Sequence, residues 1–219
     1  MELSLELTPS CIGQYYELQC DKYLIYNSVG KGDYERLGWE QPKSSINAAV
    51  LAGREWEKII LDRLDNDPSC ELKKLKKDKK ERLEQKDKKD KKKNKDHDLA
   101  EILKGLNKTE KPVYIYQACL GAPASFIQEY ISGIDIPGVS VSMTRKMYPD
   151  FIKAEYSHTM NKFKLTVIDA KNASTLKLGA EVQITLYALL LKFLIKDENI
   201  DNCIVNEDEG VVWNRENLR

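Results

Sequence analysis

The spacing of apolar residues changes along the chain, and each spacing predicts a different kind of element. In the second half, apolar and polar residues alternate or apolar residues form short runs, which is typical of β-strands. We expect strands at 113–118, 139–144, 147–155, 163–171 and 210–213. Residues 121–138 fit a helix or a strand equally well.

Three other segments have the pattern of helices. Thr8-Pro9-Ser10 is a helix-start signal, and the helix that it opens should run to about Cys20. Residues 44–65 place apolar side chains along one side, with Ser44 or Ser45 available as the cap. Residues 178–195 are apolar on nearly all sides, so this last helix should be buried.

Helices, strands, a helix and a final strand therefore follow one another. That order predicts an α/β fold with a mixed central β-sheet flanked by helices. The 219 residues are enough for one well-packed domain. We divide it into an N-terminal helical part at 1–70, a lysine-rich low-complexity insertion at 71–98 and a core with the sheet and the long helix at 99–219. Three glycines and a proline predict a loop at 30–43.

Charge is distributed unevenly, although the whole chain is neutral. Residues 73–95 contain 14 Lys or Arg and 5 Asp or Glu, a local charge of +9, so the remainder carries −9. Such a tract can be a solvated disordered insertion, a nucleic-acid-binding arm or a nuclear-import patch. With an acidic body, attraction to nucleic acid must come from local patches, from the insertion or from a partner.

Five cysteines show no C-x-x-C spacing and no secretory signal precedes them. We expect reduced thiols in an intracellular protein, in the cytoplasm or the nucleus. The longest apolar stretch, 186–195, is interrupted by Lys192 and is too short to span a membrane. The two histidines, His97 in the insertion and His158 near an expected turn, argue against a zinc site.

Candidate chemistry lies at the ends of two neighbouring expected strands. Asp169 and Lys171 are two residues apart, so their side chains should point to the same face. Asp150 brings a second carboxylate from the adjacent strand. Carboxylates suit Mg²⁺, and a lysine beside them can offset charge that develops on a phosphate. Metal-assisted phosphodiester cleavage is one interpretation, and an ordinary hairpin with a solvated lysine is the other.

Two helices add further polar candidates. Glu57 lies between apolar residues of the 44–65 helix, so it either points inward as a third carboxylate or is a surface acid. Gln183 and Tyr187 are four residues apart and share one face of the buried helix. This pair either bonds the sheet for structural reasons or serves an active site.

Together these residues resemble the PD-(D/E)XK nuclease superfamily, in its RecB-like branch. Pro149-Asp150 and Asp169-Ala170-Lys171 resemble the two halves of the family motif, and Gln183 with Tyr187 resembles the Q-x-x-x-Y motif of the branch. Gly53 with Glu57 is similar to the helix signature of the branch. Thr8-Pro9-Ser10, followed by Cys20 and Tyr23, is similar to its N-terminus.

The resemblance implies a restriction-endonuclease-like core and a Mg²⁺- or Mn²⁺-dependent nuclease, with DNA favoured over RNA. Chain ends or single strands would be preferred. It implies that Glu57, Asp150, Asp169 and the Ala170 carbonyl hold the metal and that Lys171 serves the nucleophilic water. Gln183 and Tyr187 would orient the site or contact the nucleic-acid backbone.

One departure and one alternative accompany this resemblance. Some RecB-like nucleases hold an iron–sulfur cluster with one early and three late cysteines, but only Cys203 follows Tyr187, so we expect no cluster. The alternative function is a non-catalytic nucleic-acid- or partner-binding module with a nuclease fold. Such a module could be an accessory domain of a helicase–nuclease protein. Retention of the acids and the lysine argues against it.

Overall fold

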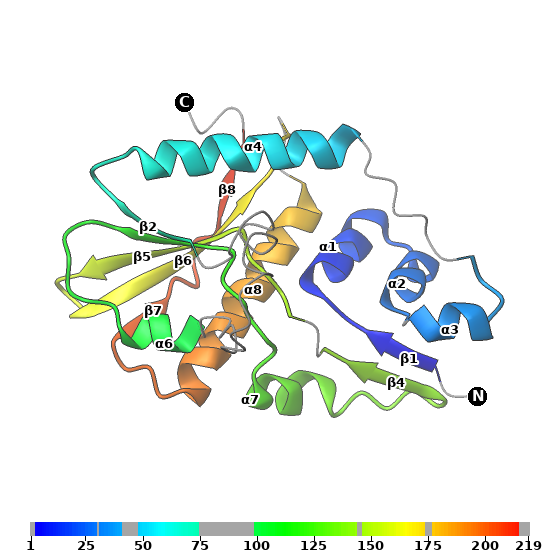
Figure 1. Cartoon of the computed structure of the whole chain (residues 1–219). Coiled ribbons are helices and arrows are strands. Elements are labelled where there is room, and N and C mark those ends of the chain that lie inside the picture. Colours follow the sequence, from blue (N-terminus) through cyan, green and yellow to red (C-terminus); the bar gives the residue numbers. More distant parts are fainter. Residues whose placement is uncertain are drawn as a thin grey trace, which may run out of the picture.

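The computed structural model describes residues 3–29, 31–40, 48–74, 99–143, 146–173 and 177–214, with the backbone alone for 31–32 and 48–50. The chain is a mixed α/β protein. A central mixed sheet has helices on both faces, and a smaller group of helices and strands lies at one end (Figure 1). The predicted α/β class and the mixed, helix-flanked sheet are therefore confirmed.

The central sheet contains six strands in the described part of the chain. They are β2 (Glu71–Lys74), β3 (Val113–Tyr116), β5 (Phe151–Ser157), β6 (Lys162–Ala170), β7 (Cys203–Val205) and β8 (Val211–Trp213). Strand β3 is antiparallel to β5, and β5 is antiparallel to β6. Strand β2 pairs in parallel with β3, and both β7 and β8 pair in parallel with β6. The end of β6 is thus enclosed by a strand on each edge.

Helices cover the two faces of this sheet because strand residues alternate between them. On one face, Ile60 of α4 (Ala48–Asp65) packs with Phe151 and Ile168. On the other face, α8 (Leu178–Asp197) and α6 (Leu99–Lys104) pack over the strand residues that point the opposite way, including Leu165 and Val167. Figure 1 shows α4 crossing above the sheet and α8 on the opposite side.

Helix α8 is the most apolar element. An 18-residue window of this 20-residue helix has a mean hydropathy of 1.6, so length and composition alone would let it cross a membrane. Helices buried in a protein core pass the same test. In this fold α8 lies against the central sheet, and Leu190 and Leu191 are fully buried, as predicted for this segment.

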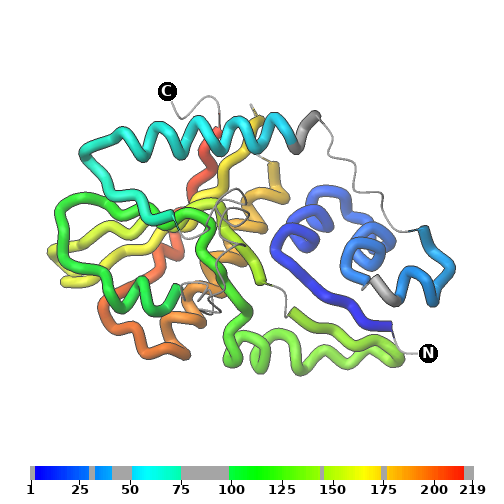
Figure 2. Tube along the Cα trace, in the orientation of Figure 1, coloured from blue at the N-terminus to red at the C-terminus, as the bar shows by residue number. Residues whose placement is uncertain are grey.

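The smaller group is built around the N-terminus. It contains α1 (Pro9–Leu18), α2 (Asp21–Ser28), α3 (Lys31–Arg36) and a two-stranded parallel sheet of β1 (Leu3–Glu6) and β4 (Val139–Ser142). Figure 2 shows the N-terminal strand running beside the distant segment that carries β4. The Thr8 hydroxyl accepts a hydrogen bond from the Cys11 N–H at 3.2 Å, so the helix start predicted at Thr8-Pro9-Ser10 is confirmed.

Several predicted boundaries were wrong for identifiable reasons. The expected loop at 30–43 contains α3, where buried Tyr34 packs edge-on against Tyr26. The strand expected at 147–155 begins only at Phe151, because Met147 instead forms a bridge with Leu120. The ambiguous stretch 121–138 contains the short helix α7 (Ala124–Phe126) and a π-helical turn, η1 (Ile127–Ile131).

The insertion was predicted to begin at residue 71, where the structure has a strand. Residues Glu71–Lys74 form β2, at the edge of the central sheet. Lysines on an edge strand oppose unwanted strand pairing, which is why its composition resembles that of the tract that follows. The rest of the predicted insertion, 75–98, and the predicted caps Ser44 and Ser45 lie outside the described residues.

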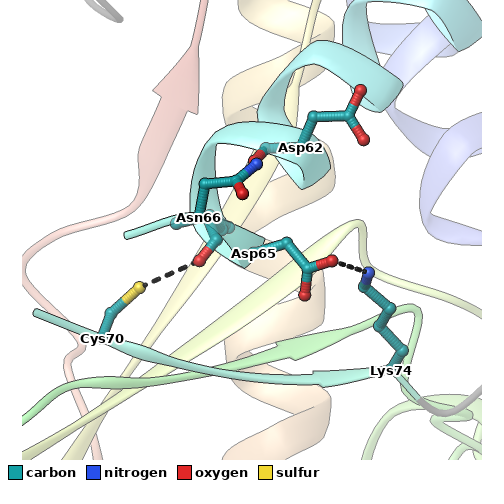
Figure 3. A network of polar contacts seen from close by, with 6 residues as sticks. Asp62, Asp65, Asn66, Cys70 and Lys74 are labelled. Atoms are coloured by element: carbon teal, nitrogen blue, oxygen red, sulfur yellow. Dashed lines mark hydrogen bonds and ion pairs between the residues drawn. The ribbon is translucent and has the colours of Figure 1, made fainter. Parts of the chain in front are cut away.

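Polar contacts join the end of α4 to β2. Figure 3 shows Lys74 ion-paired with Asp65 and the Cys70 thiol bonded to the backbone of the same helix end. The Lys74 Nζ–Asp65 Oδ2 distance is 2.8 Å, and the Asn66 amide donates to the Asp62 carbonyl at 2.6 Å. These contacts turn the chain sharply from the helix into the strand.

Helices α1 and α8 touch through two glycines, which couples the smaller group to the core. A Cβ at Gly13 would lie 2.4 Å from the Gly179 carbonyl oxygen, and a Cβ at Gly179 would lie 2.8 Å from the Gly13 carbonyl oxygen. Both distances are far below van der Waals contact. Only glycine at each position allows the two backbones to approach this closely.

We therefore expect Gly13→Ala to lower the free energy of unfolding by about 1–3 kcal/mol, the cost of overpacking a tight contact. Urea unfolding followed by circular dichroism measures this change. Gly133→Ala is the matched control, because its added Cβ meets no atom within 4 Å. Equal stability of the Gly13 and Gly133 variants would show that the helices separate without cost.

Candidate functional site

Two carboxylates meet at one end of the central sheet. Phe151 at the start of β5 pairs with Ile168 near the end of β6, so this antiparallel register brings Asp150 opposite the end of β6. The Ala170 N–H donates to Asp150 Oδ2 at 2.8 Å, which fixes the carboxyl group between the strands. Asp169 lies on the same face of β6 as Val167, toward α8.

Ionising Asp150 and Asp169 at the same time would cost free energy. Burial, and next the negative charge of Asp169, raise the pKa of Asp150 to about 8. The hydrogen bond from the Ala170 N–H opposes this increase. Asp150 therefore holds a proton at neutral pH in this structure and shares a side-chain hydrogen bond with Asp169.

Lys171 supplies the counter-charge. Its Nζ lies 2.8 Å from Asp169 Oδ2, so the two side chains are adjacent, as the two-residue spacing predicts. The geometry is that of an ion pair only, since Asp169 Oδ2 is buried and accepts no regular hydrogen bond. The Asp169 side chain is 4% exposed, whereas the Lys171 side chain is 40% exposed and reaches the surface.

Glu57 approaches from α4 but is held by another residue. Gln117 Nε2 donates to Glu57 Oε1 at 2.7 Å, and the Gln117 N–H donates to the Asp150 carbonyl at 2.9 Å. The charge of Glu57 still contributes to the raised pKa of Asp150, after burial and Asp169. Glu57 thus lies within electrostatic range of the carboxylate pair.

Gln117 is a residue that the sequence did not single out. It has a φ of 47°, a left-handed conformation that is uncommon for residues other than glycine. Such strain persists only where surrounding contacts determine it, and Gln117 makes contacts to both acidic segments. A glutamine directly after a strand is too common to be a signal, so only the three-dimensional contacts identify it.

The predicted polar pair of α8 lies on the same side of the sheet. Tyr187 is 5% exposed. Burial raises the pKa of its hydroxyl to about 12, against the lowering effect of hydrogen bonds with the Gln183 and Ser10 side chains. The charges of Asp150 and Asp169 also raise it, so the Tyr187 hydroxyl lies near the carboxylates. Ser10 comes from α1 and was not predicted as a site residue.

A cleft of about 440 Å³ opens beside these residues. It is lined by α1, by the end of β6 and by the first turns of α8, and it includes Ala170, Lys171 and Gln183. A second cavity of about 370 Å³ lies across α8, along residues 206–214, and none of the predicted site residues lines it. The first cleft is thus lined by three of the predicted site residues, whereas Glu57, Asp150, Asp169 and Tyr187 do not line it.

The donor set fits a hard divalent cation. Asp150 and Asp169 provide carboxylate oxygens of the kind that Mg²⁺ and Mn²⁺ prefer, and Asp169 Oδ2 is a buried oxygen without a hydrogen bond. Among the described residues, no three acidic, cysteine or histidine side chains already converge as a metal-ligand group. Glu57 in particular faces Gln117.

The raised pKa of Asp150 predicts an unusual dependence of stability on pH. Its folded pKa of about 8 exceeds the ordinary 3.8, so the proton-bound form contributes stability that is complete below about pH 4. That contribution, on the order of a few kcal/mol, is lost as pH rises toward 8. Urea unfolding in EDTA should show the decline in the wild type, and Asp150→Asn should flatten it. An equal slope in both proteins would contradict the shared proton.

Comparison of the chain with protein-family models, with curated proteins and with solved structures finds no match in any of the three.

Proposed function

We propose that this chain is a Mg²⁺- or Mn²⁺-dependent nuclease that hydrolyses phosphodiester bonds, with DNA favoured as substrate, on a restriction-endonuclease-like core. The observation that carries the proposal is the pair Asp150 and Asp169 at one end of the sheet, with Lys171 against Asp169 and open to the cleft. An ordinary β-hairpin would not bury two acidic side chains next to each other.

Asp150 and Asp169 would hold the cation, together with Glu57 and the Ala170 carbonyl. A bound divalent cation supplies charge that stabilises a phosphate and lowers the pKa of water. Its positive charge also removes the reason for Asp150 to keep a proton, so binding should release that proton to solvent. Glu57 must leave Gln117 to join the carboxylates.

The remaining residues would orient the reacting groups and stabilise charge. Lys171 points its ammonium group toward the carboxylate pair from the exposed side, where it can stabilise negative charge on an attacking oxygen or on the phosphate. Tyr187 keeps its proton at all ordinary pH values, because its pKa is about 12, and so it can only donate or accept hydrogen bonds. Together with Gln183 it would orient Asp150 and Asp169 from the α8 side.

A cleavage assay on end-labelled single-stranded DNA, double-stranded DNA and RNA tests the proposal. We expect cutting with Mg²⁺ or Mn²⁺ and none with EDTA. Loss of activity in Asp169→Asn excludes a contaminating enzyme. Strands that stay intact with either metal, while the same strands bind, would instead support the alternative of a non-catalytic nucleic-acid-binding module.

A further inference from the structure

Gln117 lies where β3 leaves its ladder with β5. The ladder ends at Tyr116, and the Gln117 N–H then donates to the Asp150 carbonyl at 2.9 Å. Beyond this point Leu120 and Met147 pair through two backbone hydrogen bonds, of 2.8 and 3.0 Å, and they continue the register of the ladder. The chain therefore changes conformation at Gln117 without an inserted residue on either strand.

The left-handed conformation of Gln117 changes the face to which its side chain points. Along β3, Ile115 packs in the core under α8, and Tyr116 packs on the side of α4. Regular alternation would place Gln117 on the same face as Ile115. With a φ of 47°, its side-chain amide instead donates to Glu57 Oε1 of α4 at 2.7 Å. A strained backbone thus supports one specific contact, with an acid of α4.

Glu57 is kept apart from the other two acids by this arrangement. Asp169 shares the α8 face of β6 with Val167, whereas Glu57 comes from the helix on the opposite face. In the part of the chain that the structure describes, no three acidic, cysteine or histidine side chains lie close enough to hold a metal ion. Glu57 is half-buried, so water competes only partly for its hydrogen bond with Gln117.

We propose that Gln117 is a positioning residue whose side-chain amide holds Glu57 apart from Asp150 and Asp169, and that it thereby sets the affinity of the site for a divalent cation. The inference rests on the proposed function, because it assigns the cation to the same acids. Glu57 has to give up its hydrogen bond with Gln117 before it can serve as a third carboxylate. Since each added carboxylate strengthens a site for a hard cation, the glutamine lowers the affinity.

Gln117→Gly tests this role directly. It removes the side-chain amide, keeps the N–H that bonds the Asp150 carbonyl and suits the left-handed backbone. Calorimetry with Mn²⁺ at constant pH, without nucleic acid, measures the affinity. We expect the variant to bind Mn²⁺ about threefold more tightly or better, the factor that corresponds to one lost hydrogen bond. In the Glu57→Gln background the same substitution should have no effect.

Gln19→Gly is the matched control. Gln19 also has a left-handed φ, of 50°, and its side-chain amide donates to the Tyr16 carbonyl of α1 at 2.7 Å. Its substitution therefore makes the same backbone change without releasing an acid, and Mn²⁺ affinity should not change. Gln117→Met is a second test variant, because it keeps the length of the side chain, removes the donor and should also tighten binding. Urea unfolding checks that all variants fold.

Four results would overturn the inference. Equal Mn²⁺ affinity of Gln117→Gly and Gln19→Gly would show that the hydrogen bond does not restrain Glu57. Weaker binding by Gln117→Gly would mean that Gln117 holds Glu57 in position as a ligand. Tightening that persists in the Glu57→Gln background would have a cause other than Glu57. Absence of Mn²⁺ binding by the wild type and every variant would remove the site itself.

The outcome also separates this inference from the proposed function. Cleavage by the wild type, with Gln117→Gly indistinguishable from its control in Mn²⁺ affinity, would leave the nuclease in place and remove the role of Gln117. Tighter Mn²⁺ binding that depends on Glu57, without cleavage of any strand, would retain the role of Gln117 in a protein that binds the cation and does not cut.

Discussion

Asp169→Asn should reduce cleavage by at least about 10²–10³-fold, the loss that follows removal of one group that stabilises transition-state charge. The substitution keeps the shape of the side chain and removes the charge that the cation needs. Asp169 is 3% exposed and lies at the end of β6, beside Asp150. Single-turnover cleavage with saturating Mg²⁺ measures the effect on the chemical step.

The same variant should not lose stability in EDTA. In the wild type the buried Asp169 charge raises the pKa of Asp150, so its removal lowers the cost of ionising Asp150. The partner left behind, Lys171, is 40% exposed and can be hydrated without a carboxylate. Wild-type cleavage by a pure sample of this variant would rule out the catalytic assignment, and a strong loss of stability would mean that Asp169 is chiefly structural.

The parts of the site that could be predicted follow from local periodicity. A two-residue repeat on a strand brings Asp169 next to Lys171, and a four-residue repeat on a helix brings Gln183 next to Tyr187. These relations depend only on the element type, which the apolar pattern indicates. The expected class of fold was confirmed for the same reason. Asp150, however, lies just before its strand instead of within it.

The contacts that could not be predicted join segments far apart in the sequence. Ser10 reaches Tyr187, and Gln117 reaches Glu57, through the packing of helices on a sheet. No local repeat encodes such distances. The edge strand β2 was missed for a different reason: its two lysines match the composition of the tract after it, while its partners on β3 lie about 40 residues later in the chain.

Lys171 is the position where stability and catalysis should separate most clearly. Lys171→Met removes the charge and retains a long apolar stem, and we expect cleavage to fall by about 10²-fold or more. It leaves the buried Asp169 carboxylate without its ion pair, so the free energy of unfolding in EDTA should also fall. Asp169→Asn, by contrast, should not lose stability, although both variants lose activity.

Two further measurements decide what Lys171 does. Calorimetry should find that Mg²⁺ or Mn²⁺ binds the Met variant nearly as well as the wild type, since the cation replaces the lysine as counter-charge of Asp169. Lys171→Arg should keep most of the stability but not the rate, because a planar guanidinium cannot place one compact charge at the same point. If metal binding collapses in the Met variant, or if the Arg variant cleaves at the wild-type rate, Lys171 serves to hold Asp169 in place and does not act on the reacting atoms.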